Sequence, residues 1–551
     1  MQKLPLNLYP EKMRKISHDE SKASNFSVAK ELACFMASTL GPQSAQKVIV
    51  GSDFQHYILT SDGKTILQRF ELAEFKARHP VAQLMVELAK STDDEVGDGT
   101  TSSVILAGAL LTKAERLIDL GLHPNIVSEG YKKATLKSIE IMEALAIPVK
   151  NDDMLRKVAR TSIDTKYMLS GTKKQKESKS LADVVLSAVH KVEESKNGEI
   201  TANPDNVHIV KMGGEDIFDT LLFSGFIVEK EALHPSMPKY LEDVTVALLD
   251  VPLTVKRYDG LFGEISNCGV EMDSVKQYKS QKDDEKSVLY DTVNKITDLG
   301  AGLIVSRKLM DESIGKMLSD KGIIAIQAIP TKEDLNLLSR ACGAKIISDI
   351  EQMTKDDLGF ADSVRQKRYP NRTVHVFIET KKANSATILL RGGIAHALSD
   401  IARAVHDSLH TTANAYNSKI LPGGGATEMY ISAQLKKYAL SIKTKKQLAV
   451  KAYAEALEVI PQTLAKNCGI DPISAITDLR KDHALGNKYR GFDTIQKKIV
   501  NMVDNGIVES LVTKKQIFKG ADETSRIIML SDDIIYGNVL EGRIEEKTHG
   551  N

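Results

Sequence analysis

The stretch Val96-Gly97-Asp98-Gly99-Thr100-Thr101-Ser102-Ser103 joins two apolar helical patterns and has the composition of a phosphate-binding turn. Its two glycines allow the backbone to turn sharply and to approach a ligand closely. The run from Thr101 to Leu120 is predicted as a helix, so its first N–H groups and positive dipole end would face the turn. The simpler interpretation is a glycine turn with helix-capping residues, and this short motif alone does not exclude it.

The length and composition indicate a multidomain globular protein. A chain of 551 residues is too long for one core, whereas 42% hydrophobic and 27% charged residues are ordinary values. The net charge of +1 gives no reason to expect nucleic acid or an anionic membrane as a partner. We see no apolar run of membrane-spanning length and no signal-type N-terminus, so we expect no membrane association. Free thiols and a cytoplasmic location are expected from four widely separated cysteines, Cys34, Cys268, Cys342 and Cys468.

The first 151 residues are predicted to be mostly helical. A helix over 26–38 ends at Gly41-Pro42, and two short strands near 48–50 and 56–60 form a hairpin. His79-Pro80 begins a helix that leads into the glycine turn. This part of the chain therefore consists of long helices interrupted by glycine turns.

The sequence pattern changes in the middle of the chain from mainly helical to mixed. Strands rich in Val and Ile, such as 244–249 and 302–305, alternate with helical patterns, which is typical of an α/β domain. The segment from Thr254 to Ser274 is too long for a tight connection, and we interpret it either as a protrusion with an apolar tip or as an ordinary surface loop. The chain then becomes helical again and closes with a strand-like pattern over 526–530.

The order helical, mixed, α/β, mixed, helical indicates a nested insertion, in which the first and last segments pack as one domain. The predicted boundaries are 1–151, 152–220, 221–372, 373–411 and 412–551.

Several glycine turns and two carboxylates are candidates for chemistry. The chain has no Gly-x-x-x-x-Gly-Lys-Ser/Thr motif, and no Gly-x-Gly-x-x-Gly motif follows a strand, which argues against those two nucleotide-binding designs. Asp62 lies in a turn, and Asp407 lies on a predicted helix where the usual alternative is a solvated surface residue. His406 and Asp407 are expected to point in different directions on that helix and so to form no dyad.

Six motifs occur along the chain in a fixed order: Thr39-Leu40-Gly41-Pro42, Ser61-Asp62-Gly63-Lys64-Thr65-Ile66-Leu67, Gly97-Asp98-Gly99-Thr100-Thr101, Gly225-Phe226-Ile227-Val228-Glu229-Lys230, Leu390-Arg391-Gly392-Gly393 and Pro422-Gly423-Gly424-Gly425-Ala426-Thr427-Glu428. Taken together, they resemble those of group II chaperonin subunits, the family of the archaeal thermosome and the eukaryotic cytosolic CCT/TRiC ring. The resemblance covers nearly the whole chain in order, and the joint set is far more specific than any one motif.

The resemblance implies a multidomain α+β chaperonin fold. The five segments would be a mainly helical equatorial domain in two parts, a small α/β intermediate domain in two parts, and an inserted α/β apical domain with a helical lid protrusion. It also implies a Mg²⁺-dependent ATP hydrolase whose subunits form a double ring around unfolded or nascent client proteins. Divergence from the family pattern favours a ring of different subunits.

The resemblance also implies a nucleotide site. Asp62 and Asp407 would position the attacking water, and Asp98 would hold Mg²⁺ with the phosphates. Such chemistry needs positioning and charge neutralisation more than covalent catalysis. The Lys of Thr165-Lys166 would sense the terminal phosphate, and Gly424, Glu509 and Lys514 would approach ribose and base. The remaining nucleotide-binding residues would be Thr39, Leu40, Gly41, Pro42, Gly99, Thr100, Thr101 and Ser102.

Departures from the family pattern leave an alternative open. Gln43 and Ser44 stand where the family has Lys and Gly, and Lys64 stands where it has Ala. Lys497 replaces a further family glycine. The alternative function is a ring subunit that binds nucleotide but is structural or only weakly hydrolytic. A metabolic phosphotransferase is a third class, and we find no small-molecule pocket motif that supports it.

Overall fold

The computed structural model divides into two compact units, and each is described by itself. Unit 1 comprises Met1–Leu186 with Ser399–Asn551, and unit 2 comprises Ser187–Leu398. Over the residues described, no helix combines the length and hydropathy that a membrane crossing requires. The structure describes residues 13–16, 18–50, 57–72, 79–166, 172–196, 199–254, 287, 290–369, 373–381, 385–393 and 395–537.

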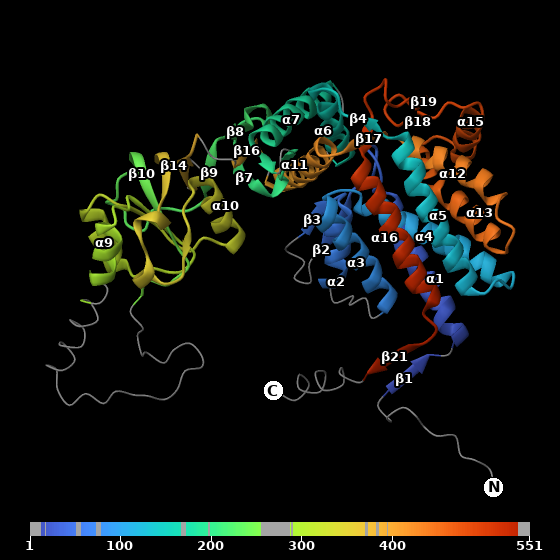
Figure 1. Cartoon of the computed structure of the whole chain (residues 1–551), viewed down its shortest axis with the longest axis horizontal. Coiled ribbons are helices and arrows are strands. Elements are labelled where there is room, and N and C mark those ends of the chain that lie inside the picture. The colour runs from blue at the N-terminus through green and yellow to red at the C-terminus, as the bar shows by residue number, and fades with distance from the viewer. Residues whose placement is uncertain are drawn as a thin grey trace, which may run out of the picture. The chain divides into compact units, whose positions relative to one another are not determined.

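Unit 1 is built around long helices from both ends of the chain. Figure 1 shows α16 (Leu511–Leu530), in red, running beside α4 (Thr100–Asp119) and α5 (Pro124–Leu145). Their apolar faces meet in one core in which Leu106, Leu110 and Phe518 are fully buried. Segments that are some 400 residues apart in the chain therefore share one hydrophobic core.

Further helices pack on this core, apart from three whose residues Leu155, Leu186 and Ala415 belong to a separate apolar cluster. The helices are α1 (His18–Ala37), α2 (Gly63–Leu72), α3 (Pro80–Val96), α6 (Asp152–Lys166), α7 (Thr172–Lys191), α11 (Ala395–Tyr416), α12 (Ala426–Ala439), α13 (Lys446–Leu457), α14 (Val459–Asn467) and α15 (Pro472–Ala484). The paired strands are β1 (Met13–Ile16) with β21 (Ile534–Gly537), β2 (Lys47–Val50) with β3 (Tyr57–Thr60), and β18 (Arg490–Asp493) with β19 (Lys498–Asn501). A three-stranded sheet has β17 (Lys419–Pro422) in the middle, between β20 (Val508–Ser510) and β4 (Ile147–Pro148).

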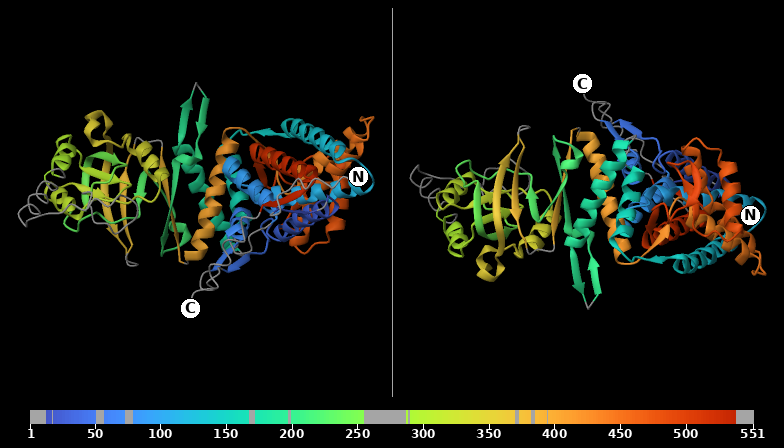
Figure 2. Two further views of the ribbon diagram at one scale, coloured as in Figure 1. Left: turned by 90° about the horizontal axis from the view of Figure 1, so that it is seen from below. Right: turned by 90° about the horizontal axis from the view of Figure 1, so that it is seen from above.

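Unit 2 contains a seven-stranded mixed sheet. Its order is β12 (Ile324–Ile326), β11 (Leu303–Ser306), β10 (Tyr240–Leu249), β14 (Gly359–Arg368), β15 (Val374–Glu379) and β9 (Gly225–Val228), with β13 (Ile346–Ile347) also paired to β10. The antiparallel neighbours β14 and β15 lie side by side in both views of Figure 2. Residues 246–249 and 303–305 are fully buried, which shows that the parallel part of the sheet is covered on both faces.

The rest of unit 2 supports or adjoins this sheet. A three-stranded sheet has the order β7 (Val207–Gly213), β16 (Ala386–Gly392), β8 (Leu221–Phe223), and β5 (Glu193–Lys196) pairs with β6 (Glu199–Ala202). The helices α9 (Glu312–Asp320) and α10 (Lys332–Cys342) alternate with strands, so the predicted α/β character of this region is confirmed.

The structure bears on two segments that the sequence analysis interpreted, 526–530 and 254–274. The strand-like run over 526–530 is wrong, because these residues form the last turns of α16. Ile528 and Met529 are buried in the helical core, and this packing outweighs the strand propensity of the β-branched residues. The predicted protrusion of 254–274 falls, apart from Thr254, outside the described residues.

Candidate functional site

A cavity of about 390 Å³ lies within unit 1. This volume is in the range of small-molecule sites, roughly 300–1,000 Å³. Segments from both ends of the chain form its wall, so tertiary packing brings together most of the residues that the sequence analysis selected. The predicted residues that line it are Thr39, Leu40, Gly41, Pro42, Asp98, Gly99, Thr100, Thr101, Ser102, Thr165, Gly424, Glu509 and Lys514.

The glycine turn between α3 and α4 forms one side of the cavity. Gly97 and Gly99 have φ angles of 72° and 87°, in the left-handed region that favours glycine. A Cβ on Gly97 would lie 2.4 Å from the Cβ of His410, and one on Gly99 would lie 2.6 Å from Cδ1 of Ile517. Within the described chain, α4 begins at Thr100 without a side-chain cap, so its first N–H groups are left to serve a ligand.

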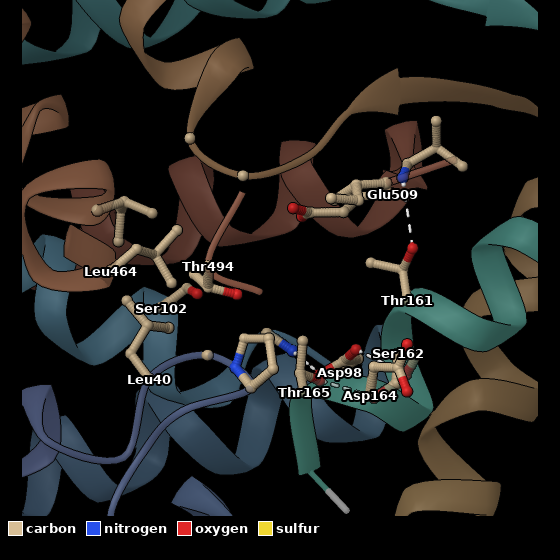
Figure 3. A pocket seen from close by; sticks show the side chains of 18 of the residues that line it. Leu40, Asp98, Ser102, Thr161, Ser162, Asp164, Thr165, Leu464, Thr494 and Glu509 are labelled. Atoms are coloured by element: carbon tan, nitrogen blue, oxygen red, sulfur yellow. Dashed lines mark hydrogen bonds between the residues drawn. The ribbon is translucent and has the colours of Figure 1, made fainter. Parts of the chain in front are cut away.

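The carboxylate of Asp98 is fixed from two directions. Its Oδ1 accepts a hydrogen bond from the Gly99 N–H at 2.7 Å, and its Oδ2 accepts one from Ser162 Oγ at 3.0 Å. Figure 3 shows Asp98 and Ser162 facing each other at the edge of the cavity. Asp98 is therefore an oriented oxygen donor beside the open N-terminus of α4.

A buried ion cluster around Lys514 forms another part of the cavity wall. The ammonium of Lys514 contacts Glu428 Oε1 at 2.5 Å and Glu509 Oε2 at 2.7 Å, and the side chains of Lys514 and Glu428 are 3% and 2% exposed. Burial alone would lower the pKa of Lys514, but the two carboxylates outweigh it and raise the pKa. Burial raises the pKa of Glu509, against the effect of Lys514. In Figure 3, Glu509 extends toward the cavity from the side opposite Asp98.

The glycine turn before α12 completes this wall. Gly424 has a φ of 59°, and its carbonyl accepts a hydrogen bond from the Phe492 N–H at 2.9 Å. Thr513, from α16, also lines the cavity, and its hydroxyl is buried without a partner among the described residues. A buried hydroxyl at a cavity wall is an interaction that a bound ligand can complete.

Asp62 caps α2 beside the cavity. Its Oδ2 accepts hydrogen bonds from the Thr65 N–H at 2.9 Å and the Thr65 hydroxyl at 2.7 Å. A Cβ on Gly63 would lie 2.7 Å from Thr101 Oγ1, so this turn packs directly against the start of α4. Ser61 lines the cavity, whereas Asp62 is not among its described lining residues.

Asp407 is buried on α11 next to the same region. It is only 4% exposed, so the alternative of a solvated surface residue is wrong. One turn later, Thr411 lines the cavity and donates its hydroxyl to the Asp407 carbonyl at 2.7 Å. Asn414 donates to the Val96 carbonyl at 3.2 Å, which holds α11 against the end of α3.

The expected separation of His406 and Asp407 is also wrong. The Nδ1 atom of His406 lies 3.4 Å from Asp407 Oδ1. Adjacent side chains diverge at a helix surface, but the imidazole is long enough to turn back toward a buried neighbour.

The structure adds residues that sequence reasoning missed. Ser162 and Thr161 reach the cavity from α6, and Asp493 and Thr494 reach it from the end of β18. Asp493 Oδ1 accepts the Ile495 and Gln496 N–H groups at 2.8 and 3.0 Å, an arrangement that an Asp in a turn makes often. That local signal predicts a turn, but nothing local predicts its place in a cavity. Lys166 ends α6, and its side chain lies outside the described residues.

Comparison with known proteins gives matches over most of the chain. The TCP-1/cpn60 chaperonin family model matches residues 32–538. The chain is 36% identical over 532 residues to thermosome subunit beta of Methanothermobacter thermautotrophicus, covering 96% of this chain and 94% of the relative. It is 38% identical over 543 residues to thermosome subunit alpha of Saccharolobus shibatae, with coverages of 96% and 94%. A solved open-state monomer of a group II chaperonin from Methanococcoides burtonii matches with a TM-score of 0.58 and 31% identity, covering 79% of this chain and all of that one.

Proposed function

The chain belongs to the TCP-1/cpn60 chaperonin family as a group II, thermosome-type, ATP-dependent chaperonin subunit, and on this premise we propose how its residues bind and hydrolyse ATP. The observation that carries the proposal is the uncapped start of α4 at Thr100–Ser102, which lines one cavity together with the oriented Asp98. An uncapped helix N-terminus with glycines in the left-handed region is suited to phosphate oxygens.

Asp98 is the proposed Mg²⁺ ligand. Among the described residues, no group of three or more His, Cys, Asp and Glu could hold a metal. One protein carboxylate together with substrate phosphates is a usual way to hold Mg²⁺. Bound there, the cation would neutralise phosphate charge, while Thr100, Thr101 and Ser102 orient the phosphates through their N–H groups and hydroxyls.

Asp62 and Asp407 are the proposed water-positioning residues. The turn of Asp62 packs on the start of α4, and Asp407 lies one helical turn from the cavity-lining Thr411. Both carboxylates thus approach the phosphate end from different elements. Their proposed role is to orient a water molecule for attack, since phosphoryl transfer depends mainly on position.

The other end of the cavity is proposed to receive the nucleoside. Leu40 and Leu464 line the cavity with apolar surface, and Glu509 lines it with a carboxylate. Because the Lys514 ammonium is already bound by two carboxylates, we assign Lys514 to holding Glu509 rather than to direct contact with the nucleotide. Lys166 remains the proposed sensor of the terminal phosphate.

The weakly hydrolytic alternative rests on Gln43, Ser44 and Lys64. None of the three is among the described lining residues of the cavity. Lys64 instead forms ion pairs with Asp93 and Asp94 of α3. This placement favours a subunit that retains hydrolysis.

The deciding experiment compares the full chain with Asp62→Asn and Asp407→Asn. Asparagine keeps the helix cap at position 62, so the change removes charge rather than local structure. We expect hydrolysis to fall about 100-fold, the scale of a positioned proton acceptor, while ATP affinity stays within a few-fold. Asp522→Asn, a buried carboxylate away from the cavity, is the control.

If both variants hydrolyse ATP as fast as the parent, Asp62 and Asp407 do not position the attacking water. A parent that binds ATP but releases no phosphate would instead establish the non-hydrolytic alternative.

The proposal includes assembly into a double ring with other subunits, in which unfolded or nascent proteins are enclosed. Two relatives are named thermosome subunits alpha and beta, which supports a ring of more than one subunit type. The hairpin of β2 and β3 supports a subunit contact, because its cross-strand pairs Val48–Leu59 and Val50–Tyr57 expose apolar side chains on one face. Native mass spectrometry of the purified particle tests this, and a monomer or an open filament would contradict it.

We also place the protein in the cytoplasm. Cys34, Cys342 and Cys468 are free thiols, as expected in a reducing compartment, whereas Cys268 lies outside the described residues. Fractionation of the source cells tests this placement.

A further inference from the structure

The hydroxyl of Ser162 joins α6 to the glycine turn. It donates to Asp98 Oδ2 at 3.0 Å, and the residue is only 3% exposed. The same carboxylate receives the Gly99 N–H on its other oxygen. Figure 3 shows Ser162 approaching Asp98 from α6, while Asp98 itself belongs to the turn below the cavity.

The neighbouring hydroxyls of α6 behave differently. Thr161 donates to the Lys157 carbonyl at 2.9 Å, and Thr165 donates to the Ser162 carbonyl at 2.6 Å. Such bonds to the preceding turn are the usual choice for hydroxyl side chains in a helix. Ser162 instead makes its bond across to another element, so the position of Asp98 depends on it.

Thr161 connects the same helix to β20, the strand that includes Glu509. Thr161 Oγ1 accepts the Val508 N–H at 3.4 Å, and the backbone of Gly506 packs on the aliphatic part of Lys157. Figure 3 shows the Thr161 bond at the side of the cavity near Glu509. Two consecutive residues of α6 therefore contact the metal-binding turn and the strand that carries Glu509.

We propose that Ser162 is a positioning residue that sets the affinity of the site for Mg²⁺ through Asp98. A carboxylate oxygen has two acceptor sites, so it can receive the hydroxyl and still coordinate a cation. Partners that orient a metal ligand typically change metal affinity by about 10- to 100-fold when removed. This inference rests on the proposed Mg²⁺–ATP function of the cavity.

The experiment measures metal binding separately from nucleotide binding. The full chain is loaded with a non-hydrolysable ATP analogue and titrated with Mn²⁺, followed by electron paramagnetic resonance. In Ser162→Ala we expect Mn²⁺ affinity to fall about tenfold, while analogue affinity in EDTA stays within about twofold. Ser408→Ala is the matched control, because its buried hydroxyl bonds α11 to the Ala159 carbonyl of the same α6 without touching Asp98.

Ser162→Cys is a second variant, which keeps the proposal testable if Ser162→Ala fails to fold. A thiol keeps a donor at this position but is larger and a weaker donor than a hydroxyl, so the Mn²⁺ affinity of Ser162→Cys should lie between those of the parent and Ser162→Ala. Parent-like Mn²⁺ binding in both variants would overturn the inference. An equal loss of metal-bound and metal-free analogue affinity would also overturn it, since it indicates a general structural role. A parent that binds no analogue would refute the proposed function itself.

Discussion

The ammonium of Lys64 lies 2.6 Å from Asp93 Oδ2 and ties the first turn of α2 to the last turn of α3. A second contact, to Asp94 Oδ1, measures 3.0 Å. Burial opposes the charged form of Lys64, but its hydrogen bonds to the two carboxylates raise the pKa of the amine. A residue that departs from the family pattern therefore joins α2 to α3, the helix that leads into the glycine turn at Gly97.

Lys64→Ala is expected to weaken folding and leave nucleotide binding nearly unchanged. Because the ion pair is partly exposed, its loss should lower the free energy of unfolding by about 1 kcal/mol or less. ATP affinity, measured by calorimetry, should stay within about twofold, because Lys64 contacts α3 rather than the described cavity wall. Lys137→Ala, which breaks an exposed pair with Glu140 within one helix, should show no measurable change in stability. A loss of ATP affinity in Lys64→Ala alone would contradict this assignment.

Lys514→Met should be strongly destabilising. It leaves Glu428 and Glu509 as neighbouring carboxylates without their shared cation, and removing one partner of a buried ion pair typically costs about 3–5 kcal/mol. The double variant Lys514→Met with Glu428→Gln removes one of these charges and should recover part of the loss. Denaturant unfolding of the three proteins measures the effect. If the single variant is as stable as the parent, the cluster does not support the fold.

Gly97→Ala and Gly121→Ala separate backbone strain from steric overlap. Both glycines have positive φ angles, 72° and 87°, but only Gly97 is closely packed, against His410. Gly121→Ala should cost about 1–2 kcal/mol from strain alone, and Gly97→Ala should cost more. Because Gly97→Ala displaces the turn that we propose to bind phosphate, it should also reduce ATP affinity, whereas Gly121→Ala should not. Equal effects on stability and binding would contradict the close packing at Gly97.

The buried carboxyl group of Asp522 is expected to make the free energy of unfolding depend on pH. It is 5% exposed on α16, and burial raises its pKa to about 6. Because the folded pKa exceeds the value of about 3.9 in unfolded chains, the folded state binds the proton more tightly. The contribution of this group to stability therefore falls as the pH rises from about 4 to about 6 and stays low above that.

Asp522→Asn should remove this dependence. The variant should be more stable than the parent near neutral pH, and the difference should shrink as the pH falls toward 4. Denaturant unfolding between about pH 5 and pH 7.5 measures the two proteins. A variant that is less stable than the parent at every pH would show that the charged carboxylate is favourably paired, through Arg526 at 3.6 Å or otherwise.

Much of the local structure could be predicted from the chain alone. The helix after Gly99, the helix that begins at Pro80 and the β2–β3 hairpin all occur where the residues indicate them. Glycine and proline act through their own backbone angles, and apolar periodicity marks the buried face of each helix. The strand-like run over 526–530 shows the limit, because the core packing of α16 outweighs its local pattern.

The features of the candidate site also fall into two groups, those that local sequence determines and those that tertiary packing determines. The amino-acid sequence determines that Gly97 and Gly99 form a turn, that α4 begins uncapped after it and that Asp98 lies within it, because each follows from neighbouring residues. Only the tertiary structure decides that Ser162 orients Asp98, that Asp407 is buried beside the turn and that Lys514 unites two carboxylates. Ser162 lies 64 positions from Asp98, Lys514 lies 86 positions from Glu428, and Asn414 of α11 lies 318 positions from its partner Val96. Their geometry depends on how whole helices pack, which no local backbone preference specifies.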